Sequence, residues 1–222
     1  MAEAPKLLGG RYEVDTLLGR GGMADVHLGY DTRLGRQVAV KMLRSELARD
    51  QTFLTRFRRE AQSAAGLNHA SIVAVYDHGE DSVTESGGAE VRVPYIIMEF
   101  VDGKTLREVI TERGTLEPTE AMRITEGVLD ALAYSHRHGI VHRDIKPANV
   151  MWDPATKKAK LTDFGVACLI DASKTKTGTV LGSPYYMSPE QVAGAHVDGR
   201  SDIFSLGVTM YQLLTGELPF KA

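Results

Sequence analysis

Hydrophobic and polar residues alternate through much of the first half of the chain, and this pattern predicts β-strands. In the first strand Tyr12, Val14, Thr16 and Leu18 would share one face. We expect strands over residues 12–18, 24–30, 36–43, 72–77 and 94–100. Three glycines within 19–22 predict a tight turn between the first two strands, and the polar stretch 81–90 predicts a loop between the last two.

Helical spacing takes over after residue 50. Phe53, Phe57, Glu60 and Ala64 fall on one helix face, with Asp50 placed to cap the helix and Gly66 to end it. Further helices are predicted over 106–113, 118–138 and 203–214, each followed by a glycine. A strand-rich segment followed by a helical segment predicts an α+β fold, with the boundary near residues 99–103.

Two charged residues interrupt these apolar patterns. Lys41 shares a strand face with Ala39, and Glu60 shares its helix face with Phe53 and Phe57. A lysine that extends its ammonium to solvent and a glutamate at the edge of its helix would explain each residue alone. Because a buried charge is costly without a partner, the two together favour an ion pair.

Composition limits the class of protein. The chain of 222 residues is 43% hydrophobic and 25% charged, which is typical of globular domains. Its net charge of -3 gives no overall basic field, so we expect no nucleic-acid partner. The single cysteine cannot form an internal disulfide, and we find neither a membrane-spanning apolar run nor a signal-peptide core. We therefore expect a soluble, cytoplasmic segment.

The strongest chemical signal is the run His142-Arg143-Asp144-Ile145-Lys146-Pro147-Ala148-Asn149, followed by Asp163-Phe164-Gly165. Asp144, Asn149 and Asp163 offer the hard oxygen atoms that suit magnesium, and Lys146 adds positive charge. The glycine turn lies between two strands, which disfavours a dinucleotide-binding motif but allows backbone N–H groups to face phosphates.

Taken in order, these residues resemble the signature motifs of protein kinases: Gly19, Gly21, Lys41, Glu60, Asp144, Asn149, Asp163 and Ser188-Pro189-Glu190. Residues 11–220 are similar to bacterial, actinobacterial-type serine/threonine kinases, including the membrane-anchored kinases with PASTA repeats. The resemblance implies a bilobal fold, with an N-lobe over 11–98, a hinge over 99–103 and a C-lobe over 104–222. Family members continue through further C-lobe helices, so we expect an incomplete C-lobe.

The resemblance also implies a role for each motif residue. Lys41 would hold the α- and β-phosphates of ATP and would itself be held by Glu60. Asp144 would accept the proton of the substrate hydroxyl, and Lys146 would neutralise charge on the γ-phosphate. Asn149 and Asp163 would bind Mg2+, with Mn2+ as an alternative metal. The residues expected to bind ATP are Leu18, Gly19, Gly21, Val26, Ala39, Lys41, Met98, Glu99, Val101 and Met151.

The same resemblance predicts regulation and partners. Arg143 is expected to be a buried cation that awaits a phosphorylated residue, for which Thr175 and Thr177 are the preferred sites. The partners would be proteins with serine or threonine acceptors, and a second copy of the chain in a transient homodimer for autophosphorylation in trans. Asp202 is expected to brace the backbone near Asp144. His136 and His138 are expected to be cations of a last helical turn.

Two other functions remain open from the sequence. An incomplete C-lobe would suit a nucleotide-binding scaffold or a catalytically impaired kinase fragment. A small-molecule kinase of the aminoglycoside type is disfavoured by the long segment from Asp163 to Glu190, which shapes a peptide platform in the protein kinases.

Overall fold

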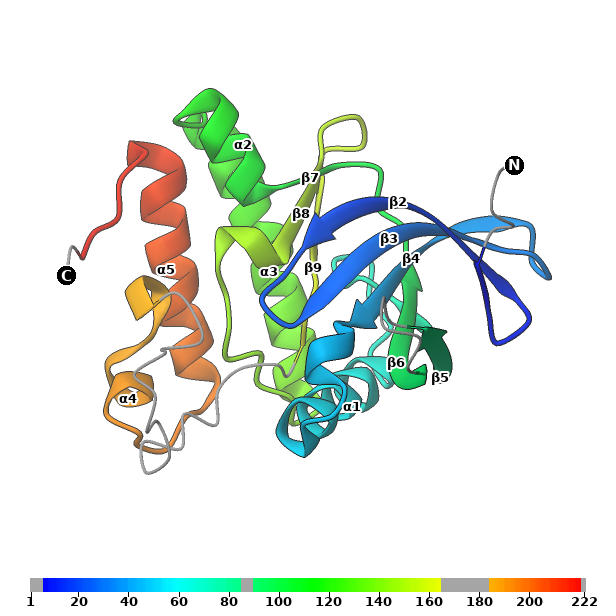
Figure 1. Cartoon of the computed structure of the whole chain (residues 1–222). Helices are drawn as coiled ribbons and strands as arrows, with labels where there is room; N and C mark the ends of the chain where they lie inside the picture. Colours follow the sequence, from blue (N-terminus) through cyan, green and yellow to red (C-terminus); the bar gives the residue numbers. More distant parts are fainter. Residues whose placement is uncertain (1–5, 85–89, 165–183, 221–222) are drawn as a thin grey trace. The chain divides into compact units, whose positions relative to one another are not determined.

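The computed structural model describes residues 6–84, 90–164 and 184–220 (Figure 1). The chain forms two compact units. The N-terminal unit comprises residues 1–66 and 74–101, and the C-terminal unit comprises residues 67–73 and 102–222.

An antiparallel sheet of six strands forms most of the N-terminal unit. Its strands lie in the order β1-β2-β3-β4-β6-β5. Their bounds are Lys6–Leu8 (β1), Tyr12–Arg20 (β2), Ala24–Asp31 (β3), Arg36–Leu43 (β4), Val75–Thr84 (β5) and Glu90–Glu99 (β6). One face of the sheet buries an apolar cluster of Leu8, Tyr12, Val38, Val40, Tyr95 and Ile97. Strand β4 lies between β3 and β6, so its β-branched residues Val38 and Val40 are buried inside the sheet.

Helix α1 (Gln51–Ala65) follows a short 3-10 helix, η1 (Ser45–Leu47), and packs against β5 and β6. The carboxylate of Asp50 accepts a hydrogen bond of 2.7 Å from the backbone N–H of Thr52, and Gly66 caps the other end. Its buried face includes Phe57, Ala64 and the charged Glu60. The helix and its two ends are confirmed as predicted, and so is the predicted face except for Phe53, which is only half-buried.

The β5–β6 hairpin is longer than predicted, and its first strand begins later. Residues 81–84 and 90 belong to strands instead of a loop. Strand β5 lies at the sheet edge, where Tyr76, His78, Glu80 and Ser82 alternate toward solvent. The half-buried residues between them, Asp77, Gly79 and Asp81, are also polar or glycine, so no alternation marked this edge strand and its polarity made it look like a loop.

The predicted strand over 72–77 was wrong at its start, because residues 67–73 belong to the C-terminal unit. Ile72 bridges Leu161 in parallel, and the backbone N–H of Leu161 donates to the Ser71 carbonyl at 2.8 Å. Backbone pairing between residues ninety positions apart leaves no local pattern in the sequence.

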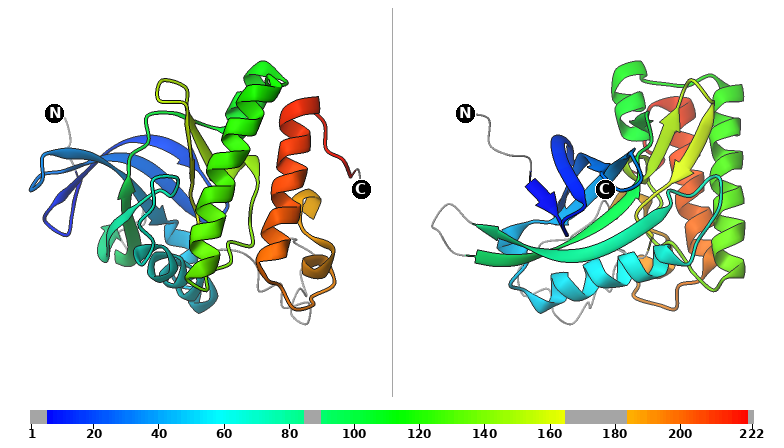
Figure 2. Two further views of the ribbon diagram at one scale, coloured as in Figure 1. Left: turned by 180° about the vertical axis from the view of Figure 1, so that it is seen from behind. Right: turned by 90° about the vertical axis from the view of Figure 1, so that its right-hand side faces the viewer.

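The C-terminal unit is mainly helical, and α3 and α5 pack side by side in it (Figure 2). Its elements are β7 (Lys104–Thr105), α2 (Leu106–Arg113), α3 (Pro118–Arg137), η2 (Pro147–Asn149), β8 (Val150–Asp153), β9 (Lys158–Leu161), η3 (Pro184–Tyr186), α4 (Pro189–Val192) and α5 (Gly199–Thr215). Helix α5 begins before the predicted residue 203, because its first turn buries the polar residues Ser201 and Asp202 instead of apolar ones.

A buried ion pair in the N-terminal unit makes its stability depend on pH. Arg11 donates to both oxygens of the fully buried Asp31, from Nε at 2.8 Å and from Nη2 at 2.7 Å. These hydrogen bonds lower the pKa of Asp31 from 3.8 to about 2. The ionised carboxylate therefore stabilises the fold above pH 3.8, and this contribution is lost as the pH falls toward 2.

We expect the Asp31→Asn variant to lose this part of the pH dependence. Urea unfolding of the parent at pH 5 and pH 2.5 should show a larger drop in the free energy of unfolding than the same comparison in the variant. Equal drops in the two proteins would contradict the assignment.

Candidate functional site

Lys41 and Glu60 form an ion pair inside the N-terminal unit, as the sequence predicted. Lys41 lies on β4 and Glu60 lies on α1, and their Nζ and Oε1 atoms are 2.5 Å apart. The residues are only 6% and 2% exposed, so neither charge is stabilised by bulk water. Because burying either charge alone would be costly, the pair holds the lysine in place and fixes α1 against the sheet.

The glycine turn next to this pair is shorter than predicted. Strand β2 continues through Gly19 and Arg20, and the turn is closed by a hydrogen bond of 2.8 Å from Gly21 N to the Ala24 carbonyl. A Cβ at Gly21 would meet that carbonyl oxygen at 2.8 Å, so the turn requires glycine there. A Cβ at Gly19 would meet no atom of the described residues within 4 Å. Packing among the described residues therefore does not explain Gly19, whose bare backbone lets another group approach closely.

The residues predicted to surround adenine in the N-terminal unit occupy neighbouring strands. Val26 pairs with Lys41, and Ala39 pairs with Met98. Ala39 and Met98 are buried, whereas Leu18 is 46% exposed. The backbone N–H of Glu99 donates to the Ala74 carbonyl at 2.8 Å, so a ligand would meet Glu99 through its carbonyl group. Val101, the last predicted contact of this set, is the last residue of the N-terminal unit.

In the C-terminal unit, Asp144 is held by two neighbours. Its Oδ2 accepts a hydrogen bond from Lys146 Nζ at 2.7 Å and another from Asn149 Nδ2 at 2.9 Å. Asn149 Nδ2 also donates to the Asp144 carbonyl at 2.8 Å. Among the described residues, both side-chain hydrogen bonds of Asp144 therefore use the same oxygen. Its Oδ1 is left to act as a proton acceptor.

Asn149 and Asp163 are connected through the backbone. The N–H of Thr162 donates to the Asn149 carbonyl at 3.0 Å, and Asp163 follows with a left-handed backbone, φ 62°. The Asn149 side chain uses its Nδ2 for Asp144, which leaves its amide oxygen as a ligand atom. One carboxylate and one amide oxygen fit the few protein ligands that Mg2+ takes when phosphates and water complete its shell. The described residues contain no cluster of three His, Cys, Asp or Glu that could hold a metal without such help.

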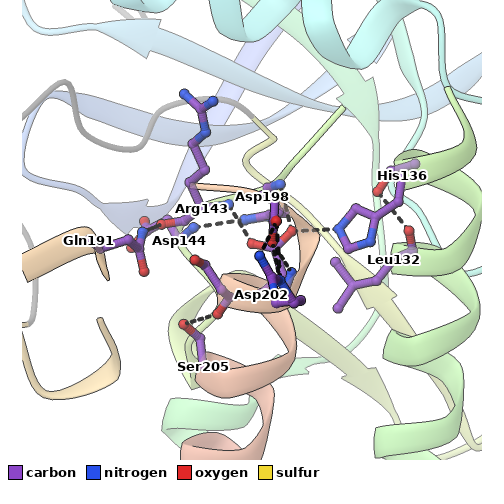
Figure 3. A network of polar contacts seen from close by, with 12 residues as sticks. Leu132, His136, Arg143, Asp144, Gln191, Asp198, Asp202 and Ser205 are labelled. Carbon is purple, nitrogen blue, oxygen red and sulfur yellow. Dashed lines mark hydrogen bonds and ion pairs between the residues drawn. The ribbon is translucent and has the colours of Figure 1, made fainter. Parts of the chain in front are cut away.

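Buried polar contacts support the backbone before Asp144. Asp202 of α5 accepts hydrogen bonds from the N–H groups of His142, at 2.8 Å, and Arg143, at 2.6 Å (Figure 3). His136 Nε2 lies 2.8 Å from Asp202 Oδ2. His142 Nε2 lies 2.8 Å from the Thr162 carbonyl oxygen. The bracing role predicted for Asp202 is confirmed by these contacts.

One expectation about this region was wrong. Arg143 is exposed, so it is not a buried cation; it also has a left-handed backbone, φ 67°. His136 lies in the last turn of α3, as predicted, and it also contacts the buried Asp202. Helical spacing places His136 at a helix end but cannot show that α5 lies beside it. Gln191, whose side chain also reaches this loop, gave no signal in the sequence.

We expect the Asp202→Asn variant to be less stable and slower in any reaction that depends on Asp144. One carboxylate oxygen would be replaced by an NH2 group facing backbone donors, which leaves a buried N–H without an acceptor. The cost should be about 1–3 kcal/mol in the free energy of unfolding. Urea unfolding would measure it, and a change no larger than that of the exposed Asp130→Asn variant would contradict the bracing role.

The predicted site residues thus fall into two groups. The N-terminal unit holds Leu18, Gly19, Gly21, Val26, Ala39, Lys41, Glu60, Met98, Glu99 and Val101, and the C-terminal unit holds Asp144, Lys146, Asn149, Met151 and Asp163. Met151 lies on β8, where it pairs with Thr105 and Lys160. Thr175 and Thr177 lie outside the described residues.

Comparison with known families identifies the fold. Residues 12–222 match the family model described as "Protein kinase domain". The chain belongs to the protein kinase family. This kinase domain is 55% identical over 221 residues to a probable serine/threonine-protein kinase of Streptomyces coelicolor, covering 98% of this chain and 32% of the relative. It is 51% identical over 219 residues to the serine/threonine-protein kinase PknB of Mycobacterium tuberculosis, covering 97% of this chain and 34% of PknB. The chain therefore spans about a third of the length of these relatives.

A solved structure shows the same fold. The kinase domain resembles the crystal structure of the Mycobacterium tuberculosis PknI kinase domain with a TM-score of 0.76 and 33% sequence identity, covering 99% of this chain and 80% of that chain. The predicted similarity to bacterial serine/threonine kinases and the predicted α+β protein-kinase fold are confirmed. Membership of the family implies ATP and a divalent metal. Among the described residues, no helix is both long enough and apolar enough to cross a bilayer.

Proposed function

We propose that this chain is the catalytic domain of a serine/threonine protein kinase that transfers the γ-phosphoryl group of ATP to protein hydroxyl groups. The arrangement around Asp144 supports this most directly, because one carboxylate oxygen is held by Lys146 and Asn149 while the other remains for a hydroxyl proton. The proposal takes residues 11–98 as the N-lobe, 99–103 as the hinge and 104–222 as the C-lobe.

In the N-terminal unit, Lys41 would bind the α- and β-phosphates, with Glu60 holding its ammonium group in position. The backbone at Gly19 and Gly21 would cover the phosphates, and the open space at Gly19 supports this role. Leu18, Val26, Ala39 and Met98 would offer apolar surface to adenine, as would Met151 of the C-terminal unit. Hydrogen bonds to the adenine edge would come from the Glu99 carbonyl and the backbone of Val101.

In the C-terminal unit, Asp144 would orient the acceptor hydroxyl and take its proton, while Lys146 would neutralise charge on the γ-phosphate. Asn149 and Asp163 would hold the divalent metal, which we propose to be Mg2+, with Mn2+ as an alternative. When bound, the metal would offset charge on the phosphates during transfer. We also propose that the domain lies in the cytoplasm, because the reaction consumes ATP, and that the full-length protein is anchored in the cell membrane, as the resemblance to membrane-anchored kinases implies.

Phosphate transfer to protein would test the proposal. The chain should be incubated with Mg2+, ATP labelled at the γ-phosphate and casein as a generic acceptor, and the label should then be mapped to serine or threonine. Labelled phosphoserine or phosphothreonine in casein would support the proposal. ATP binding without transfer would favour the alternative of a nucleotide-binding, catalytically impaired fragment or scaffold, and transfer only to a small alcohol would overturn protein kinase activity.

We also propose that Thr175 and Thr177 are autophosphorylated in trans by a second copy of the chain. Replacing both with alanine should lower turnover by about tenfold or more, because a phosphate near Arg143 could no longer form. The measurement is the initial rate on casein after preincubation with ATP. The control is Thr111→Ala, because Thr111 is exposed on α2. Unchanged turnover in the double variant would refute the regulatory role.

A further inference from the structure

Arg143, which precedes Asp144, has a backbone conformation that is unfavourable for a residue with a side chain. Its φ of 67° lies in the left-handed region, where a non-glycine residue is strained. Such a residue persists only when its surroundings hold it. Asp202 holds one side of it, since Asp202 Oδ1 accepts a hydrogen bond of 2.6 Å from the Arg143 N–H.

Gln191 holds the other side. Its Nε2 donates to the Arg143 carbonyl at 2.7 Å, and its Oε1 accepts from the Ser188 N–H at 3.0 Å. The residue is 9% exposed and lies on α4, directly after Ser188-Pro189-Glu190. Figure 3 shows its side chain directed at the backbone of Arg143. Both ends of one amide are therefore used, one on α4 and the other on the loop that contains Asp144.

We infer that Gln191 is a positioning residue that fixes the Arg143 peptide and, through it, the orientation of the Asp144 carboxylate. Asp202 and Gln191 together secure the N–H and the C=O of the strained residue. The side chain at position 191 must accept one hydrogen bond and donate another, which an amide does and an ionised carboxylate does not. The inference builds on the kinase function proposed above, because its consequence is a change in phosphoryl transfer.

The two substitutions Gln191→Met and Gln191→Glu test this role. Gln191→Met keeps the approximate shape and removes both hydrogen bonds, so kcat should fall by roughly ten- to hundredfold while KM for ATP changes by no more than about twofold. In Gln191→Glu, the ionised carboxylate would face the Arg143 carbonyl and repel it. Once protonated, the introduced carboxyl would donate as the amide does. Its kcat relative to the parent should therefore rise several-fold between about pH 8 and about pH 6.

Gln212→Met is the matched control, because Gln212 accepts a hydrogen bond of 2.6 Å from Tyr186 Oη and has no described contact with the loop. Gln212→Met should have the same kcat as the parent. The ratio of its kcat to that of the parent should not change between about pH 8 and about pH 6. Parent-like kcat in Gln191→Met, or a ratio for Gln191→Glu that does not rise at low pH, would overturn the inference.

Hydrogen exchange gives a readout that does not depend on activity. The backbone amides of residues 142–149 should exchange faster in Gln191→Met than in the parent or in Gln212→Met, because a strained loop with one support removed opens more often. Unchanged exchange would overturn the inference even in a chain that transfers no phosphate. A parent without transfer would overturn the proposed function instead, so the two failures can be distinguished.

Discussion

Replacing Asp144 with asparagine is expected to reduce phosphoryl transfer by about 10³-fold, within the range that general-base catalysis contributes. Asparagine has nearly the same shape, and its side-chain oxygen can still accept from Lys146 and Asn149. It cannot take a proton from a hydroxyl group. The loss should therefore appear in kcat and not in the affinity for ATP, which Lys41, Asn149 and Asp163 are proposed to provide.

The experiment compares the parent, Asp144→Asn and Asp130→Asn by the intact mass of each chain after incubation with ATP and Mg2+. Asp130 is exposed on α3, so its variant makes the same chemical change away from the proposed site. Phosphate-sized mass increments should appear in the parent and in Asp130→Asn but not in Asp144→Asn. Equal rates in all three chains would exclude Asp144 as the base.

Replacing Lys41 with methionine is expected to abolish measurable transfer and also to destabilise the fold. Removing one partner of a buried ion pair takes away the opposite charge that offsets the burial of the other, at a cost of about 3–5 kcal/mol in the free energy of unfolding. Glu60, only 2% exposed, would be left without the ammonium group that now lies 2.5 Å away. Loss of activity in Lys41→Met would not by itself show whether the cause is the missing phosphate ligand or the less stable fold.

The double variant Lys41→Met/Glu60→Met separates these effects. Two apolar side chains in place of a buried ion pair are often neutral or stabilising, so urea unfolding should recover most of the lost stability. Transfer should remain absent, because no ammonium group would bind the phosphates. Phosphoryl transfer by the double variant would contradict the role of Lys41. If the double variant were as unstable as Lys41→Met, the loss of stability could not be attributed to the buried charge of Glu60.

Much of the local structure could be predicted because it depends on residues close together in the chain. Asp50 accepts from Thr52, two residues away, and the apolar face of α1 repeats along a single helix. The ion pair of Lys41 and Glu60 could be predicted for another reason: each charge is anomalous in its own apolar pattern, and opposite buried charges need partners. The motif order then identified the family without any geometry.

The supports of the loop near Asp144 could not be predicted in the same way. Arg143 is contacted by Asp202, 59 residues away, and by Gln191, 48 residues away. In the sequence, His136 looks like an ordinary residue at a helix end, and Gln191 looks like an ordinary surface glutamine. Their contacts with the loop follow from how α3, α4 and α5 approach it, which no hydrophobic period encodes.

The sequence by itself determined the α+β class, most of the helices and the kinase motifs, since these follow from local periodicity, helix-ending glycines and motif order. Only the tertiary structure decided that residues 71–73 pair with Leu161, that Arg143 is exposed, and that Gln191 contacts the Arg143 carbonyl. The physical reason is that hydrogen bonds between distant segments depend on distances and directions in space. The chemistry of a side chain limits the hydrogen bonds that it can form, and the tertiary structure determines which of these hydrogen bonds form.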